Sequence, residues 1–425
     1  MPNHPPAARS ASAARRRLLP MTGRDPGEQH RVASNLELIF DLTFAAAFSI
    51  ASSQLAHALA GGHWTTALAG YTLAMFGTCW AWVNFSWFAS AYDTDDWAYR
   101  LTTMLQMVGV IVFALGIPPM FASLEHGAVN NHVMVAGYVV MRLAMIVHWL
   151  RAARQDPQRR GACLIYARTI AVAQVGWVAL ASAATGLAVT AACMAALALI
   201  ELAGPVFAER RAATPWHAHH IAERYGLLAV IALGEGIAGT IAAVSAVVAA
   251  DGWSWQAGCL VTAGTGLTFG MWWAYTTMPS AEVLHIARGK SFVWGYGHIL
   301  VFGSIVATGA GLHVAAYKLQ HQAELSDTAA VLTTVVPVGL FLLMLYGLYY
   351  WLLPGWEPLH GLLAALTVVI LLGCGLLAAA GVAMPVCLLV LTLATLPTII
   401  GYEYRGHRHQ HAAVTRLAGH AGELP

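Results

Sequence analysis

The sequence predicts an all-α polytopic membrane protein with about twelve transmembrane helices. Of its 425 residues, 58% are hydrophobic and only 10% are charged, whereas globular chains carry roughly 25% charged residues. About twelve apolar stretches are long enough to cross a bilayer, which takes ~20 residues as a helix. The alternating segments of ~10 residues that form membrane β-barrels are absent from the pattern.

The expected spans follow one another with short connections. They cover residues 36–60, 66–92, 101–123, 131–150, 163–185, 187–208, 223–249, 255–278, 291–316, 328–352, 358–380 and 383–402. The turns inside 163–208 and 358–402 are short, so the boundaries there are the hardest to place.

Both ends of the chain are predicted to be cytoplasmic tails. Residues 1–33 are rich in Ala, Arg and Pro and lack an apolar run, which is typical of a disordered segment. Only two leucines follow the arginine run before a proline, too few for the core of a signal peptide. Residues 405–425 form the second tail, where His407, His409 and His411 are expected to be solvated.

The positive charges predict the orientation. With twelve spans, the N-terminus and every second loop share one side, and 20 of the 22 Lys and Arg residues fall on that side or at its boundary. Lys318 in an outer loop and Arg142 inside a span are the exceptions. Because positive loops stay cytoplasmic, we expect a protein of the bacterial cytoplasmic membrane with both termini inside.

Some landmarks recur at a nearly constant offset. Glu37 and Glu223 open spans 186 residues apart, and Arg100 and Arg288 are 188 residues apart. Such offsets predict two parallel six-helix repeats, residues 34–210 and 211–404, as in some transporters with central sites. Aromatic belts place tryptophans at span ends in any protein, so coincidence stays open as the alternative.

Composition bears on partners and cofactors. A net charge of +2 is too small to indicate nucleic acid. The six cysteines lie in apolar segments without CxxC or zinc spacing, as small buried side chains do. No metal or cofactor is implied. The expected partners are membrane lipids and a small-molecule or ion substrate of unknown identity.

Three stretches carry a family resemblance. Residues 37–44 are ELIFDLTF, residues 92–96 are YDTDD followed by Arg100, and residues 220–227 are HIAERYGL, continuing to LGE at 233–235. Together they resemble the bacterial low temperature requirement A (LtrA) family, with its ELFFDLVF opening, its acidic loop after span 2 and its HxxERxGL…LGE stretch.

The resemblance implies a multi-pass membrane protein of poorly defined biochemical activity. The family name implies a link to growth in the cold, but it implies no reaction. Thr43 departs from the usual apolar residue of the first pattern, and no part of the pattern falls in residues 290–425.

Glu235 is the first candidate for binding a proton or a substrate. It lies roughly 18 Å along the helix from Glu223 at ~1.5 Å per residue, close to mid-bilayer. A carboxylate at that depth costs about 2.5–3.5 kcal/mol and normally has a partner or a task. The alternative is a neutral side chain hydrogen-bonded to a neighbouring span.

Arg142 and Glu201 are two further candidates inside spans. Each lies about eight residues from the cytoplasmic end of its span, so they share a depth. They either contribute to a substrate site or form a structural ion pair, which such residues need in the membrane.

Glu37 and Asp41 are four residues apart and share one helical face. They predict an acidic site for a cation or proton near the cytoplasmic mouth. For Glu37 the alternative is a capping box with Ser34, because Ser-x-x-Glu suits a helix N-terminus.

The loop after span 2 contains Asp93, Asp95 and Asp96. It could bind a cation, hold a gating loop to Arg100 or Arg288, or cap span 3. It lacks the ligand spacing of an EF-hand.

A third candidate group for gating or coupling is His220, Glu223 and Arg224, within one helical turn. His-x-x-Glu alone is a weak metal signal, so interfacial packing and salt bridging are favoured. Eight tryptophans are expected mostly in the interfacial belts: Trp80, Trp82, Trp87, Trp97, Trp253, Trp255, Trp272 and Trp273.

The function expected from these features is a secondary transporter or permease, with protons coupled through Glu235 and Asp41. One alternative is an intramembrane or lipid-handling enzyme acting on the envelope, for which the acidic loop is the best argument. However, no GxSxG, HExxH or P-loop motif appears, so an enzyme is not favoured. The other alternative is a membrane sensor or scaffold.

Overall fold

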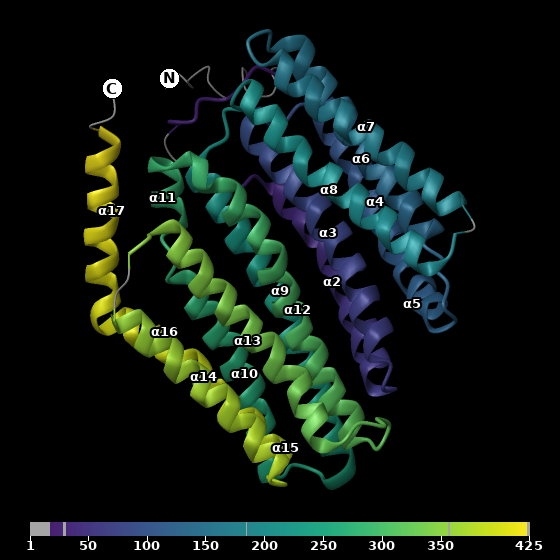
Figure 1. Ribbon diagram of the computed structural model, residues 1–425, viewed down its shortest axis with the longest axis vertical. Coiled ribbons are helices and arrows are strands. Elements are labelled where there is room, and N and C mark those ends of the chain that lie inside the picture. The colour runs from purple at the N-terminus through teal and green to yellow at the C-terminus, as the bar shows by residue number, and fades with distance from the viewer. Residues whose placement is uncertain (1–17, 29–30, 184, 356–357, 423–425) are drawn as a thin grey trace, which may run out of the picture. The chain divides into compact units, whose positions relative to one another are not determined.

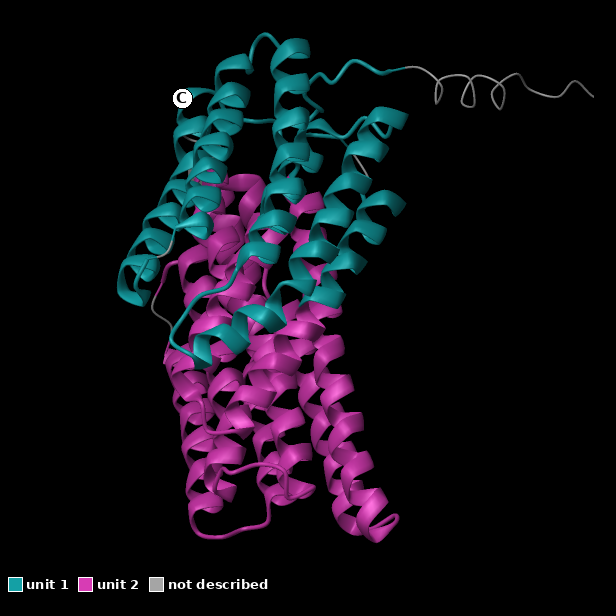
Figure 2. Ribbon diagram, turned by 90° about the vertical axis from the view of Figure 1, so that its right-hand side faces the viewer, with its two compact units in different colours: residues 1–47, 81–217 teal, residues 48–80, 218–425 magenta. Residues whose placement is uncertain are grey.

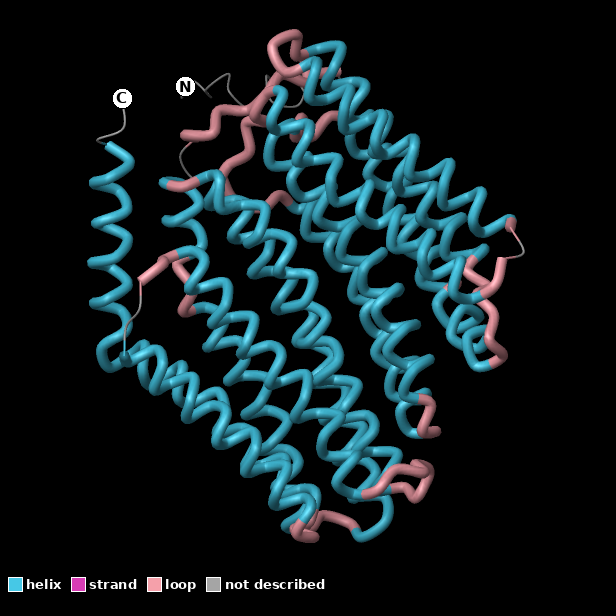
Figure 3. The backbone as a smooth tube through the Cα atoms, viewed as in Figure 1, coloured by secondary structure: helices cyan, strands magenta, loops and turns pink. Residues whose placement is uncertain are grey.

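The computed structural model describes residues 18–28, 31–183, 185–355 and 358–422. Within these ranges the secondary structure is helical and no strand occurs (Figure 3). The predicted all-α fold class is therefore confirmed.

The helices are labelled in Figure 1. The first group is α2 (Asn35–Ala60), α3 (Trp64–Tyr92), α4 (Trp97–Leu115), α5 (Ile117–Glu125), α6 (His132–Gln155), α7 (Arg160–Ser182) and α8 (Leu187–Arg211). The second group is α9 (Ala218–Asp251), α10 (Trp255–Thr276), α11 (Ser280–Ile286), α12 (Ser291–Leu319), α13 (Asp327–Leu352), α14 (Pro358–Ala379), α15 (Met384–Thr392), α16 (Leu396–Gly401) and α17 (His407–Gly422).

These helices match the twelve predicted spans, with α4–α5 and α15–α16 each serving as one. Among the described residues, ten helical stretches are long and apolar enough to cross a membrane. The other two predicted spans are α3 and α10. Both contain no Asp, Glu, Lys or Arg, but they are rich in Trp, Tyr, Gly and Thr, which lowers their mean hydropathy.

Side-chain caps define several helix starts. Asp96 accepts a hydrogen bond from Tyr99 N at the start of α4, and Ser254 and Ser326 make equivalent caps on α10 and α13. Each cap satisfies a backbone N–H that the helix itself leaves unpaired. These residues therefore place the turns that separate consecutive spans.

The chain divides into two compact units (Figure 2). Unit 1 comprises residues 1–47 and 81–217, and unit 2 comprises residues 48–80 and 218–425. The later division lies seven residues beyond the predicted one, but α2 and α3 are each shared between the units. The interpretation of the two halves as a parallel repeat stays a prediction.

Unit 1 has an aromatic core between α3, α6 and α7. Phe88 packs edge-on against Trp149 at 4.8 Å between ring centroids, and Trp149 stacks on Tyr166 at 4.0 Å. Close approach of α4 and α6 depends on glycine, since a Cβ at Gly137 would lie 2.2 Å from Phe113 N. Small residues at such crossings are typical of membrane helices.

Unit 2 is organised around α12, which packs against α9 and α13. A Cβ at Gly239 would lie 2.6 Å from Gly309 O, and a Cβ at Gly311 would lie 2.5 Å from Thr333 O. Backbone therefore meets backbone at both crossings, and side chains on these helices have little freedom to shift.

The described part of the N-terminal tail is packed on unit 1, which corrects the expectation of disorder for this stretch. Met21 is fully buried and its N–H donates to Gln155 Oε1 at 2.6 Å, while Arg24 N donates to Ala91 O. Composition suggested disorder because the segment lacks an apolar run, yet these contacts are made by its backbone. Residues 1–17 lie outside the described residues. At the other end, most of the predicted tail forms α17.

Candidate functional site

Glu235 lies near the middle of α9 and is only 8% exposed. Its backbone packs on α12, because a Cβ at Gly309 would lie 2.6 Å from the Glu235 carbonyl carbon. Two hydroxyls from the second half of α2, those of Ser49 and Ser52, lie beside the carboxyl. The crossing with α12 therefore fixes the carboxyl next to α2.

The oxygens at this place are not satisfied. Glu235 Oε2 and Ser52 Oγ are both buried, and neither has a hydrogen-bond partner among the described residues. Ser52 is fully buried, whereas Ser49 is exposed. Buried polar atoms are normally hydrogen-bonded, and leaving one unpaired costs roughly 1–3 kcal/mol. An unsatisfied carboxylate oxygen is therefore an indication of function.

Another ionisable residue of unit 2, His298, is satisfied. Its Nδ1 lies 2.7 Å from Trp294 O and its Nε2 lies 3.1 Å from Tyr275 Oη. Tyr225 and Phe302 pack around the ring. His298 is thus a core histidine held by two hydrogen bonds.

The predicted ion pair between Arg142 and Glu201 is present in unit 1. Arg142 Nη2 donates to Glu201 Oε2 at 2.7 Å, and both residues are almost fully buried. Three neutral groups also donate to the same carboxylate: Tyr138 Oη at 2.9 Å, Trp177 Nε1 at 3.1 Å and Gln174 Nε2 at 3.3 Å. A carboxylate with four donors is held in one place, which suits a structural role.

Asp41 is also buried and partnered. It is fully buried in α2, and Trp82 Nε1 of α3 donates to its Oδ1 at 2.7 Å. Trp82 and Trp80 are fully buried, so these two tryptophans lie inside the protein and not in a belt. Trp253, in contrast, is 78% exposed, as expected for a belt residue.

Glu37 forms the capping box that its spacing predicts. Ser34 N donates to Glu37 Oε2 at 2.7 Å, and Glu37 N donates to Ser34 Oγ at 3.3 Å. Arg31 Nη2 lies 3.9 Å from Glu37 Oε1 and 3.4 Å from Asp93 Oδ2. Arg31 therefore faces two carboxylates, those of Glu37 and Asp93, at the N-terminal end of α2.

Asp93 titrates near neutrality because of these surroundings. Burial raises its pKa to about 6, and the neighbouring Glu37 carboxylate adds to this effect. Arg31, the Asp95 N–H and Arg24 oppose the rise in pKa without cancelling it. Asp93 can thus change charge near neutral pH, which the sequence pattern did not indicate.

Asp96 behaves in the opposite way. Burial alone would raise its pKa, but hydrogen bonds from Arg151, Tyr99 N and Leu19 N lower it to about 2. Arg151 Nη1 lies 3.1 Å from Asp96 Oδ1, and Arg151 Nη2 donates to Leu19 O. Asp96 is therefore a charged helix cap that also holds the N-terminal segment, which agrees with the capping alternative.

The other predicted gating residues are separated by burial. Asp95 and Arg100 form an exposed bidentate pair at 2.7–2.8 Å. In α9, His220 and Arg224 are fully buried whereas Glu223 is exposed. His220 and Arg224 therefore point into the protein, whereas Glu223 lies at its surface.

The acidic and histidine-rich stretches do not bring potential metal ligands together in the described residues. Within the part of the chain that the structure describes, no group of three or more His, Cys, Asp or Glu residues could hold a metal ion.

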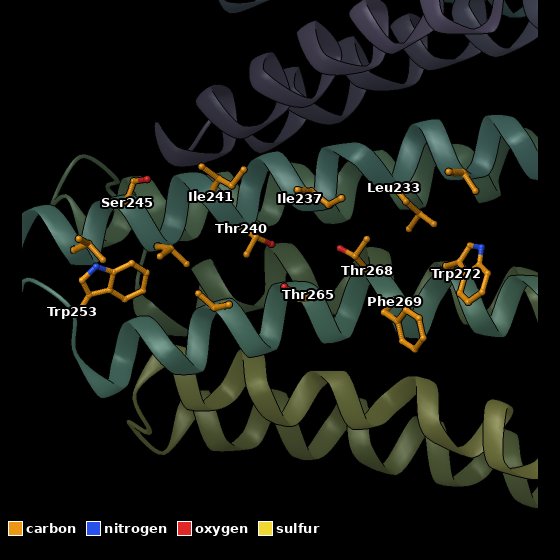
Figure 4. A pocket seen from close by; sticks show the side chains of 14 residues that line it. Leu233, Ile237, Thr240, Ile241, Ser245, Trp253, Thr265, Thr268, Phe269 and Trp272 are labelled. Carbon is orange, nitrogen blue, oxygen red and sulfur yellow. The ribbon is translucent and has the colours of Figure 1, made fainter. Parts of the chain in front are cut away.

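A groove of about 690 Å³ runs between α9 and α10 in unit 2 (Figure 4). Leu233, Ile237 and Ile241 line it from α9, and Phe269 and Trp272 line it from α10. Hydroxyls interrupt the apolar lining at Thr240, Ser245, Thr265 and Thr268. Trp253 and Trp272 stand at opposite ends of the groove.

Sequence reasoning identified Glu235 but missed its neighbours. Ser49 and Ser52 are three residues apart, a spacing that places two side chains on one helical face. That spacing was the available signal, but serines are common in apolar spans. Asp41 belongs to unit 1 and Glu235 to unit 2, so their predicted cooperation stays a prediction.

Comparisons with known proteins place the chain among relatives without a defined activity. It is 25% identical to an uncharacterized protein of Rhizobium meliloti (strain 1021) over 295 residues, or 66% of this chain and 68% of that protein. No solved structure matches the chain. The model of the bacterial low temperature requirement A protein family matches residues 32–395. With its apolar helices, the chain is an integral, multi-pass membrane protein that belongs to the bacterial low temperature requirement A family.

Proposed function

We propose that this protein is a secondary transporter or permease of the bacterial cytoplasmic membrane, with both termini cytoplasmic, that couples its substrate to protons through Glu235. The observation that carries the proposal is the unsatisfied Oε2 of Glu235, buried at mid-helix in a membrane span.

The physical argument concerns the cost of charge. A carboxylate at the bilayer centre is costly unless it is paired, and Glu235 has no ion pair with a described residue. Taking up a proton removes this cost, and releasing it restores it. A group with this property can link proton movement to a conformational change.

The other intramembrane carboxylates have supporting roles in this proposal. Glu201 is held by Arg142 and three neutral donors, and Asp41 by Trp82. Because these carboxylates already have partners, they maintain the helix packing of unit 1.

The test is proton flux in sodium-free proteoliposomes under an imposed pH gradient with pooled small metabolites. Glu235→Gln should abolish the metabolite-dependent flux, because the amide cannot carry a proton. Glu282→Gln is a matched control, since Glu282 is an exposed carboxylate of the same unit. Equal flux in wild type and Glu235→Gln, or none in wild type, would overturn the proposal.

A second candidate function, lipid handling, is favoured by the groove between α9 and α10. Its apolar lining and volume of about 690 Å³ fall in the range of ligand pockets, about 300–1,000 Å³. Val244→Trp should fill the groove and reduce the lipid that co-purifies, as measured by native mass spectrometry. Val293→Trp on exposed α12 surface is the control, and equal lipid retention by both variants would count against this candidate.

A further inference from the structure

Two of the unsatisfied oxygens of unit 2 lie close together. Among its described residues, four buried side-chain oxygens lack a hydrogen-bond partner: Ser52 Oγ, Glu235 Oε2, Thr334 Oγ1 and Gln410 Oε1. The first two come from different helices, α2 and α9. The Ser52 hydroxyl lies beside the Glu235 carboxyl. Two orphaned oxygens side by side indicate a third species that would bind both.

The chemistry of the surrounding atoms limits what that species is. The groups facing one another are a carboxylate, from Glu235, and two hydroxyls, from Ser49 and Ser52. All are hard oxygen donors, which suit alkali and alkaline-earth cations better than zinc or copper. The hydroxyl of Tyr71 is already used, because it donates to Gly303 O at 2.5 Å.

Charge decides between monovalent and divalent cations. The site supplies one carboxylate, and no Lys, Arg or His among the described residues of unit 2 pairs with it. A monovalent cation makes the site neutral, whereas a divalent cation leaves an uncompensated positive charge in the membrane, which is costly. Calcium sites also use more oxygen ligands than this site offers.

The backbone around the site is held in position. A Cβ at Gly309 would lie 2.7 Å from both Glu235 Cβ and Glu235 O, so the backbones of α9 and α12 are in close contact at Glu235. This contact sets where the Glu235 side chain leaves the helix, and a site on well-positioned backbone is better suited to holding one ion than a site on a loop.

We infer that Glu235, Ser52 and Ser49 form a binding site for a sodium ion, which competes with the proton for the Glu235 carboxylate. This inference rests on the proposed function, because it names the second ion that the same site would take. Sodium would occupy the space between Glu235 Oε2 and Ser52 Oγ, with Ser49 on the exposed side. Each ion displaces the other, so the site holds one positive charge at a time.

The test measures the thermal unfolding of the full chain in detergent by tryptophan fluorescence. Sodium chloride is compared with choline chloride at equal ionic strength, near pH 6 and near pH 8. We expect sodium to raise the unfolding temperature in a saturable way, and to act at lower concentration near pH 8, where fewer protons compete.

Three variants make the test specific. Glu235→Gln should abolish the sodium-dependent shift, and Ser52→Ala should weaken sodium binding by about tenfold or more through the loss of a ligand. Ser53→Ala is the matched control, because Ser53 is the next residue of α2 and is exposed. It should bind sodium as wild type does. Ser52→Ala removes one buried hydroxyl and adds no atom to the packed helix, so it is expected to fold.

Several results would overturn the inference: no shift specific to sodium, or a shift that Ser52→Ala and Glu235→Gln both retain. Proton flux in sodium-free proteoliposomes separates the two proposals. Flux without a sodium effect would leave proton coupling standing and reject the sodium site. A sodium effect lost in both variants supports the site even if no flux is found.

Discussion

Two buried glutamates of this protein have opposite surroundings. Glu201 in unit 1 accepts hydrogen bonds from Arg142, Tyr138, Trp177 and Gln174, whereas Glu235 in unit 2 has an oxygen with no partner. Both lie in apolar helices, and their sequence contexts look alike. Depth in the membrane alone therefore does not distinguish a functional carboxylate from a structural one. The number of donors around it is more informative.

The contrast has an energetic basis. Four donors compensate Glu201 for the loss of water, and removing one charged partner from such a pair typically costs 3–5 kcal/mol. Glu235 has no comparable interactions to lose. Stability measurements on matched variants can therefore test whether the two residues have different roles.

The largest effect is expected from breaking the pair in unit 1. Arg142→Met leaves Glu201 buried without its positive partner and should destabilise the protein by about 3–5 kcal/mol. The midpoint of unfolding in detergent measures it. The double variant Arg142→Met/Glu201→Gln should be less destabilised than the two single changes add up to. Simple additivity would show that the two side chains are not coupled.

A smaller effect is expected where α12 supports Glu235. Gly309→Ala places a Cβ against the Glu235 backbone and should cost about 1–3 kcal/mol, because backbone atoms cannot move aside as a side chain can. Gly303→Ala, on the same helix, is the control, since a Cβ there meets nothing within 4 Å. If both variants unfold together with wild type, the crossing does not position Glu235.

The surroundings of Asp93 are intermediate between those of Glu201 and Glu235. Asp93 has arginine partners, but the nearby Glu37 carboxylate repels its negative charge. Its pKa is about 6 in the folded protein against a usual 3.8. The folded state therefore holds the proton more tightly. The stability that this group contributes is fully present below about pH 4, and it is lost as the pH rises through 6.

Asp93→Asn should consequently stabilise the protein above pH 6, and this advantage should shrink as the pH falls toward 4. We expect about 1 kcal/mol, since the full shift corresponds to about 3 kcal/mol and two arginines lose a partner. Unfolding midpoints measured across this pH range would test it. Asp95→Asn, in the exposed pair with Arg100, should not change the slope with pH. A slope unchanged by Asp93→Asn would contradict the assignment.

The smallest effect on stability is expected at the residue ranked first for function. Glu235→Gln should change the free energy of unfolding in sodium-free buffer by less than about 1 kcal/mol, because Oε2 has no hydrogen bond to lose. The same unfolding assay measures it. A loss of unfolding free energy as large as that of Arg142→Met would mean that Glu235 has a structural role. Glu235 and Glu201 would then not differ in role.

The sequence was sufficient for features that depend on one helix at a time. Apolar length placed the spans to within a few residues, and local spacing predicted the Ser34–Glu37 capping box and the Asp96 cap. It also ranked an Arg142–Glu201 pair from shared depth, because an unpaired charge in the membrane is costly. These features follow from periodicity and from the cost of charge.

The sequence was insufficient wherever the decisive contact joins distant helices. Nothing in residues 80–82 shows that Trp82 is a buried donor to Asp41, since tryptophans in spans are more often interfacial. Ser49 and Ser52 could not be linked to Glu235 without knowing that α2 lies beside α9. Nor could the tail composition reveal the backbone hydrogen bonds that Met21 and Arg24 make.

The N-terminal segment also has a consequence for biosynthesis. Met21 is hydrogen-bonded to Gln155, which lies 134 positions later in the chain. Leu19 is hydrogen-bonded to Arg151, which lies 132 positions later. Ribosomes add roughly 5–20 residues per second, so these partners emerge on the order of ten seconds after the segment itself. During that interval the segment has neither partner, while the intervening helices are being made. Its packing on unit 1 can therefore be completed only after α6 has been synthesised.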